Sequence, residues 1–306
     1  MNNSYSSPVQ DVSVYYKVLF SILFSIVFIV GIGGNYCICW ILIKDINRNA
    51  TNIFLFNLSL ADILMCLICS PVTLVSDGLL FYWPFGSLLC KVVPFIQGIS
   101  VFLSGLTHVV ISSDRFVVVF FPMKTRLSNE CSWGLIGLTW IISIILSLPL
   151  VIVNEISTIN QNRDLCEENW KNKDHGLIYT FVVLICQYFL PVAFITSTYI
   201  AIAVKLWIRK PPGVSFPGRN EQVNNSKKRM VKMVIIVASF YSLSQLPRHV
   251  LFLIGYSNEL FFSSKHVKEL LLFSHFLSIS ATTYNIFIYL WLNRNFKESF
   301  VKSFLK

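Results

Sequence analysis

A few charged side chains interrupt stretches of sequence that are otherwise apolar, and they decide which chemistry is open to the chain. Asp62 lies inside the run 50–76, whereas Asp114 and Arg115 follow the end of the run 92–113. Two carboxyl groups can work as the acid and base of a protease only when they lie close enough to share a proton. Asp62 and Asp114 occupy different depths of their runs, and no Cys–His or metal-ligand cluster stands out. We therefore expect no enzymatic activity.

Asp62 suits a different task, the binding of a cation. An ionisable residue within an apolar membrane stretch is a candidate functional residue. A carboxylate among neutral oxygen atoms suits a hard, weakly held cation such as sodium. The expected neutral partners are Ser104 and Asn285. Sodium is the only cofactor that the sequence suggests, and the alternative is a structural aspartate that is protonated and held by hydrogen bonds.

The elements that position these residues are visible in the composition. The chain has 306 residues, of which 55% are hydrophobic and 13% are charged. A soluble domain would carry about 25% charged residues. Seven runs almost without ions are each long enough for a helix that crosses a bilayer, which takes about 20 residues. We predict an all-α membrane protein, a bundle of seven transmembrane helices over residues 18–293, with spans at about 18–43, 50–76, 92–121, 131–154, 176–207, 231–256 and 268–293.

The distribution of lysine and arginine predicts how the bundle lies in the membrane. Basic residues concentrate in the alternate connections 44–50, 114–130, 205–232 and 294–306. Because such residues favour the cytoplasmic side, we expect residues 1–17 to be extracellular and the C-terminus to be cytoplasmic. The net charge of +10 then reflects orientation in a lipid bilayer, and no nucleic-acid partner is expected.

Two features of the outer side are predicted from residue types. Cys90 and Cys166 are the two cysteines of the outer half, and an oxidising compartment allows them to form a disulfide bond. The alternative is a pair of free thiols. Asn2, followed by Asn3 and Ser4, forms a glycosylation triplet, which makes Asn2 a candidate acceptor.

The segment 294–306 predicts a surface helix. Phe296, Phe300 and Phe304 recur at a spacing of four residues, and lysines occupy the other side. Such an amphipathic helix lies on the inner membrane surface, with its apolar face toward the lipid.

The ordered set of motifs in these spans resembles the rhodopsin-like, or class A, G-protein-coupled receptors. The residues that carry the resemblance run through all seven spans: Gly34-Asn35, Leu58 to Asp62, Cys90 with Asp114-Arg115-Phe116, Trp140 with Pro149, Pro191 with Tyr199, Phe240 with Pro247, and Asn285 to Tyr289. The resemblance implies a plasma-membrane receptor that couples to a heterotrimeric G protein. It also implies a set of coupling and switch residues: Asp114, Arg115, Phe116, Tyr199, Phe240, Gln245, Pro247, Asn285 and Tyr289.

Finer motifs resemble the receptors for neuropeptide Y, RYamide, luqin and tachykinin-like peptides. They include Trp83 to Gly86, Cys90 to Gln97 and the inner-loop stretch 206–233. The resemblance implies an extracellular peptide ligand, expected to be an amidated neuropeptide. The alternatives are a lipid, odour or orphan ligand within the same class or, less favoured, a membrane transporter.

The candidate ligand contacts follow from helix position and charge. Gln97 stands where amine receptors of this class carry an aspartate, and a neutral amide forms no ion pair with an ammonium group. Acidic residues of the second outer loop could attract an arginine of the peptide. Arg248 could meet either a ligand or an outer acid. The full candidate set is Gln97, Gln187, Arg248, Phe252, His275, Glu167 and Glu168.

The chain departs from the pattern of the class at its switch positions. Gln245 stands in place of a tryptophan, Ile286 in place of a proline and Phe116 in place of a tyrosine. We expect Gln245 to form hydrogen bonds across the core and Ile286 to straighten the seventh span, since it restores the backbone donor that proline lacks.

Overall fold

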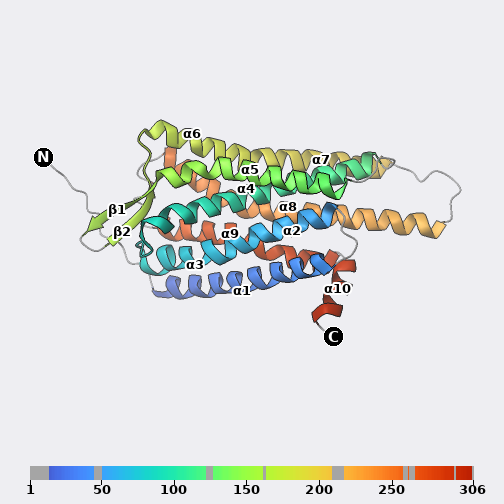
Figure 1. Cartoon of the computed structure of the whole chain (residues 1–306), viewed down its shortest axis with the longest axis horizontal. Helices are drawn as coiled ribbons and strands as arrows, with labels where there is room; N and C mark the ends of the chain where they lie inside the picture. The colour runs from blue at the N-terminus through green and yellow to red at the C-terminus, as the bar shows by residue number, and fades with distance from the viewer. Residues whose placement is uncertain are drawn as a thin grey trace.

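The computed structural model describes most of the chain. The described residues are 14–44, 50–121, 127–160, 163–208, 217–257, 261, 266–292 and 294–304. Figure 1 shows long helices that run side by side, with a β-hairpin across one end and a short helix turned away from the bundle at the other. Asn2 and the remainder of the first 13 residues lie outside the described residues, as does part of the connection 205–232.

Among the described residues, seven helical stretches form the bundle. The second stretch joins α2 (Ala50–Leu64), the π-helical η1 (Met65–Cys69), α3 (Ser70–Thr73) and the π-helical η2 (Leu74–Leu80). The fifth joins α6 (Lys173–Val183), the π-helical η3 (Leu184–Phe189) and α7 (Leu190–Ile208). The others are single helices: α1 (Val14–Lys44), α4 (Gly86–Phe120), α5 (Asn129–Val153), α8 (Pro217–Ser257) and α9 (Val267–Leu292).

These helices are those of a multi-pass membrane protein. Among the described residues, six of the seven stretches, all except α8, are long and apolar enough to cross a membrane. The apolar part of α8 is interrupted by Gln245, Arg248 and His249. These residues, together with the polar and charged stretch 217–232 at its start, make α8 less apolar than the other long helices, although its 41 residues are more than long enough.

Several helices extend past the ends predicted from hydropathy. The second stretch continues to Leu80, α4 begins at Gly86, and α8 begins at Pro217 and projects beyond its neighbours in Figure 1. An apolar run marks only the part of a helix that lies in lipid, whereas the backbone hydrogen bonds continue into polar sequence. The helix α10 (Arg294–Phe304) covers most of the predicted surface segment, and its Phe296 is buried while its Phe304 is exposed.

The second outer loop folds as a hairpin that sequence reasoning did not predict. Strands β1 (Asn154–Asn160) and β2 (Arg163–Glu168) pair antiparallel. A disulfide bond joins Cys166 of β2 to Cys90 of α4, which confirms the predicted pairing. The backbone nitrogen of Trp83 also donates a hydrogen bond to the carbonyl of Asp164, at 2.7 Å. The hairpin is therefore fastened both to α4 and to the connection that precedes it.

Buried polar side chains join the helices to one another. The Asn57 amide donates to the hydroxyl of Thr107 at 2.9 Å, and the Trp140 indole nitrogen donates to the Asn57 amide oxygen, also at 2.9 Å. Asn35 donates to the carbonyl of Thr282 at 2.9 Å. In an apolar medium such contacts replace the hydrophobic effect as the means of holding helices together, so these residues fix α2, α4 and α5 to one another and α1 to α9.

Close packing also joins α1 to α9. A Cβ atom on Gly34 would lie 2.8 Å from Cγ2 and 3.1 Å from Cβ of Ile286. Ile286 is 7% exposed and belongs to a helix that is continuous through position 286. The residue that stands in place of a proline therefore fills the space that the glycine leaves.

Candidate ligand cavity and switch residues

A large cavity opens beneath the hairpin. Its volume is about 490 Å³, and its wall comes from the outer parts of the second stretch, α4, α8 and α9, together with β2. Four predicted ligand contacts from α4, α8 and α9 line it: Gln97, Arg248, Phe252 and His275. These residues are far apart in sequence, so the cavity depends on the bundle as a whole.

Gln97 and Arg248 meet inside this cavity. With its amide oxygen turned toward α8, Gln97 accepts hydrogen bonds from both terminal nitrogens of Arg248, and the bond to Nη2 measures 2.8 Å. The ring of Phe252 lies 5.6 Å from the guanidinium carbon, within the range of a cation–π contact. Arg248 is therefore held by two neutral groups, one on α4 and one on its own helix.

A second cavity of about 140 Å³ borders the first and reaches deeper. The two share Gln97, Arg248 and Phe252, and the deeper one also contacts Gln187 of η3 and Gln245 of α8. The candidate contact Gln187 is therefore placed with the others, and an extended ligand could pass from one cavity to the next.

The two acidic candidates on β2, Glu167 and Glu168, differ in whether they line the cavities. Glu168 lines both cavities, and it accepts a hydrogen bond from the Trp170 indole nitrogen at 2.8 Å. Glu167 lines neither, and its carboxylate accepts a hydrogen bond from Ser157 of β1 at 3.3 Å. Successive side chains of a strand point to opposite faces, so Glu167 lies away from both cavities, and its contact with a ligand stays a prediction.

Sequence reasoning missed Asp77 as a cavity residue. Asp77 lines the larger cavity and accepts a hydrogen bond from Ser76 at 2.8 Å. It was assigned to the first outer loop because the predicted span ended at residue 76. The second stretch continues as a helix to Leu80, which brings this carboxylate into the lining of the outer cavity.

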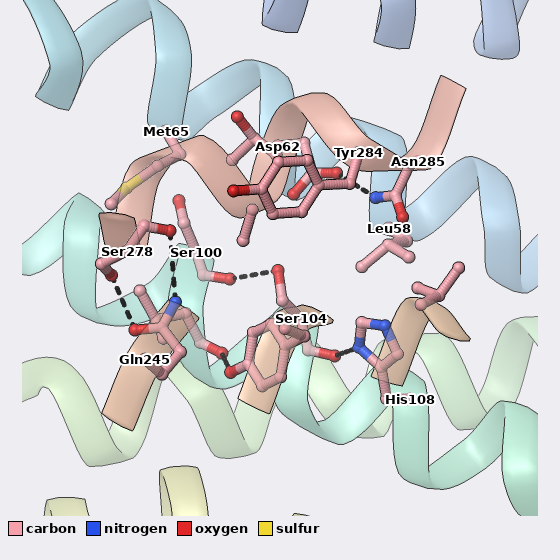
Figure 2. Close-up of a pocket in the computed structure, with 15 residues that line it drawn as sticks. Leu58, Asp62, Met65, Ser100, Ser104, His108, Gln245, Ser278, Tyr284 and Asn285 are labelled. Carbon is pink, nitrogen blue, oxygen red and sulfur yellow. Dashed lines mark hydrogen bonds between the residues drawn. The ribbon is translucent and has the colours of Figure 1, made fainter. Parts of the chain in front are cut away.

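Asp62 lies in a smaller cavity in the middle of the bundle, shown in Figure 2. Its carboxylate accepts a hydrogen bond from the Asn285 amide at 2.7 Å. Ser104 lines the same cavity, but its hydroxyl donates to the carbonyl of Ser100 at 2.9 Å. The cavity measures about 30 Å³, room for about one water molecule or an ion of that size. The structure thus brings the three predicted residues together around one space, with a direct bond between two of them.

Gln245 forms a hydrogen bond across the core, as the sequence predicted. The Ser278 hydroxyl donates to the Gln245 amide oxygen at 2.6 Å, and the Gln245 amide nitrogen lies 3.4 Å from the Ser278 carbonyl. Figure 2 shows this pair at one edge of the Asp62 cavity. Pro247 lies inside α8 two positions further on. The pair therefore links α8 to α9 at the edge of the cavity.

The aromatic residue that α8 presents to the interior is Tyr241 rather than Phe240. Phe240 is 47% exposed, and its ring contacts Tyr284 at a centroid distance of 5.1 Å. Tyr241 is 6% exposed, donates to the carbonyl of Val101 at 3.2 Å and stacks on His108 at 5.0 Å. Neighbouring helical positions differ by about 100°, so the two adjacent aromatics face different sides of α8, and Phe240, which the resemblance indicated, is the exposed one.

The other predicted switch residues gather at the opposite end of the bundle from the hairpin. A terminal nitrogen of Arg115 lies 3.7 Å from the Asp114 carboxylate and donates a hydrogen bond to the hydroxyl of Thr51. Thr51 in turn donates to Asp114 at 3.3 Å. This triad joins the end of α4 to the start of α2, so it holds the arginine in one position.

The remaining members of this set are aromatic. Tyr199 is 5% exposed, and no described residue is hydrogen-bonded to its buried hydroxyl. Tyr289 packs edge-on against Phe296 of α10 at 6.0 Å, and Phe116 stacks on Phe120 at 4.2 Å. The aromatic contact between Tyr289 and Phe296 couples the end of α9 to the surface helix.

A bundle of seven helices, an outer cavity beneath a disulfide-bonded hairpin and a buried polar core together define a class of membrane receptor. The chain belongs to the seven-transmembrane receptors of the rhodopsin family, whose family model matches residues 34–289. Membership in this family identifies a receptor rather than an enzyme.

Its relatives at about 30% identity carry peptide-receptor names. The chain is 30% identical over 297 residues to a RYamide receptor of Drosophila melanogaster and 31% identical over 304 residues to a RYamide receptor of Tribolium castaneum. It is 32% identical over 298 residues to the Tachykinin-like peptides receptor 99D of Drosophila melanogaster. These alignments cover 95%, 95% and 93% of this chain, and 64%, 81% and 56% of the respective relatives. The chain thus spans less than two thirds of the two Drosophila proteins.

Proposed function

We propose that this chain is a plasma-membrane receptor for an amidated neuropeptide and that it passes the binding signal to a heterotrimeric G protein. The observation that carries the proposal is the outer cavity of about 490 Å³, lined by charged groups from both the bundle and the hairpin. Relatives named for RYamide and tachykinin-like peptides support the same ligand class. A neutral lipid would leave the charged groups of this cavity without partners.

The geometry suggests how a peptide engages the cavity. Asp77 and Glu168 lie on its wall, where they would attract a basic residue of the ligand, as complementary charges do at other interfaces. The deeper cavity, which reaches Gln187 and Gln245, would accept the inserted end.

The signal would leave through the far end of the bundle. In this proposal, peptide binding favours a state in which the inner end of α8 moves outward and Arg115 leaves its contact with Thr51. The peptide can shift this equilibrium only if it binds that state more tightly than the resting state. Basic inner connections would place this end in the cytoplasm, where the charge also favours contact with anionic lipid. Asp62, Ser104 and Asn285 would hold a sodium ion that stabilises the resting state.

The direct test is a signalling assay with the intact chain. Cells that express the chain at their surface are exposed to a library of neuropeptides, and calcium and cAMP are recorded. The expected result is a saturable response to one or more amidated peptides that is absent from untransfected cells. A chain that is present at the surface and responds to no amidated peptide would contradict the proposal.

A further inference from the structure

The outer cavity contains more positive than negative side chains. Arg163, Arg248 and Lys268 line it, against the carboxylates of Asp77 and Glu168. Within the part of the chain that the structure describes, none of the three cationic groups lies within 4.0 Å of a carboxylate. The cavity therefore contains positive charge that the protein does not neutralise by direct contact.

Arg248 is the most enclosed of these cations. It lies where the two cavities meet, one helical turn outward from Gln245, and its side chain is half-buried. Arg163 and Lys268 are exposed. The two terminal nitrogens of Arg248 bond to the amide oxygen of Gln97, and Phe252 contacts the guanidinium group. Both direct partners are electrically neutral, and the carboxylates of Asp77 and Glu168 act on Arg248 only across the cavity, without touching it.

A guanidinium group withdrawn from water gains most from a carboxylate. A neutral amide satisfies hydrogen-bond donors but does not offset the loss of hydration of a charge. A carboxylate offers two acceptors in one plane, which match the donors of arginine, and the resulting bonds are stronger than those to a neutral acceptor. A ligand carboxylate that displaced or joined Gln97 would therefore be favoured over a neutral group of the same shape.

We propose that Arg248 recognises a carboxylate of the ligand, so that the peptide presents an acidic group to the junction of the two cavities. This inference rests on the proposed function, since it concerns the same cavity. The carboxylate can come from an acidic side chain of an amidated peptide or from a free C-terminus. Asp77 and Glu168, which line the same outer cavity, are then left for a basic residue of the same ligand.

The first test uses the intact receptor and matched peptides. RYamide, tachykinin-like and neuropeptide Y peptides are synthesised in four forms: amidated or free at the C-terminus, each with its Asp and Glu residues either kept or replaced by Asn and Gln. The form without any carboxylate should be roughly 10- to 100-fold less potent than the best form, the range expected for a charge-assisted bond. Retained potency of the amidated form with acidic side chains assigns the carboxylate to a side chain, and retained potency of the free-acid form without them assigns it to the C-terminus.

The second test asks whether Arg248 causes the difference in potency between peptides with and without a carboxylate. Arg248→Gln should reduce the potency ratio between the best form and the carboxylate-free form to near 1. Gln97→Glu keeps the shape of the side chain and gives Arg248 an internal carboxylate, so it should reduce the ratio in the same way without emptying the site. Lys171→Gln removes a positive charge from an exposed residue of the outer loop that lines neither cavity, so it should leave the ratio unchanged. Surface labelling of each variant shows which ones fold, and Gln97→Glu carries the comparison if Arg248→Gln does not reach the surface.

The outcomes separate this inference from the function on which it rests. A carboxylate-free peptide as potent as the best form on the unaltered receptor overturns the role of Arg248 and leaves the peptide receptor standing. A ratio that persists in Gln97→Glu or in folded Arg248→Gln also overturns it. If no peptide in any form activates a receptor that is present at the surface, the proposed function itself fails.

Discussion

Gln245 and Ser278 exchange hydrogen bonds between α8 and α9, at 2.6 Å from hydroxyl to amide oxygen and 3.4 Å from amide nitrogen to carbonyl. The pair occupies the position at which the class usually carries a large aromatic side chain. A polar link in place of a bulky ring means that the relative position of these two helices depends on directional bonds rather than on steric bulk.

Replacing Gln245 by leucine should therefore loosen α8 from α9. The Ser278 hydroxyl would lose its buried acceptor, at a cost of about 1–3 kcal/mol to the state that contains the bond. We expect a lower melting temperature in detergent and a higher basal signal in cells. Ser244→Ala is the matched control, because that hydroxyl donates to the carbonyl of Phe240 within α8. Equal basal signals from both variants would contradict a role for the link between the helices.

Arg115→Ala should abolish G-protein signalling while leaving peptide affinity largely unchanged. Arg115 lies at the end of the bundle far from the outer cavity, where it contacts Asp114 and Thr51. Thr51→Val keeps the size of the side chain but removes the hydroxyl that holds the arginine, so this variant should raise the basal signal. Radioligand binding and cAMP measured on the same membranes check both expectations. Signalling that survives in Arg115→Ala would show that the arginine has been given the wrong role.

Asn57→Leu should lower the free energy of unfolding by about 1–3 kcal/mol, because it leaves the buried Trp140 indole without its acceptor and the Thr107 hydroxyl without its donor. The substitution removes bonds to both Thr107 and Trp140. Trp140→Phe removes one of the two and should cost less. Thermal unfolding in detergent measures the order of the two effects. A smaller loss for Asn57→Leu than for Trp140→Phe would mean that Asn57 does not bridge the three helices.

Cys90→Ser and Cys166→Ser should each reduce surface expression, and the double variant should be no worse than either single one. A disulfide bond is worth about 2–5 kcal/mol in native proteins, and both substitutions remove the same bond. Cys131→Ser, at an exposed free cysteine, should express normally. Additive losses in the double variant would show that the two cysteines act separately.

Sodium should lower agonist affinity in the unaltered receptor and lose this effect in Asp62→Asn. The carboxylate, with Asn285 and the neighbouring Ser104, lines a space of about 30 Å³. Asp77→Asn removes a carboxylate from the outer cavity instead and should keep the sodium effect. Competition binding in sodium and in N-methylglucamine buffers makes the comparison. The same sodium sensitivity in all three proteins would exclude Asp62 as the site.

Features that depend on residue type, and not on the exact rotation of a helix, were predictable from the sequence. Each apolar run is longer than the hydrocarbon thickness, so the number and order of helices follow from hydropathy alone. The disulfide bond followed because the outer half of the chain contains few cysteines. The bond between Gln245 and α9 followed from the need of a buried amide for a partner.

Features that depend on rotation or on local register were not predictable in the same way. Tyr241 and Phe240 are adjacent and chemically alike, so only the rotation of α8 decides which one faces α4. Glu167 and Glu168 likewise fall on opposite faces of a strand that the sequence analysis did not predict. Asp77 was missed because hydropathy locates the end of an apolar run rather than the end of a helix.

The contact between Gly34 and Ile286 makes two positions on different helices share one fixed volume. A methyl group at position 34 would meet the branched carbon of Ile286 at 3.1 Å, which the backbones of α1 and α9 would have to relieve by moving apart. An isoleucine therefore fits at position 286 only while position 34 is a glycine. Gly34→Ala alone should be poorly tolerated, whereas Gly34→Ala combined with Ile286→Ala should recover, so the two sites are expected to vary as a pair rather than independently.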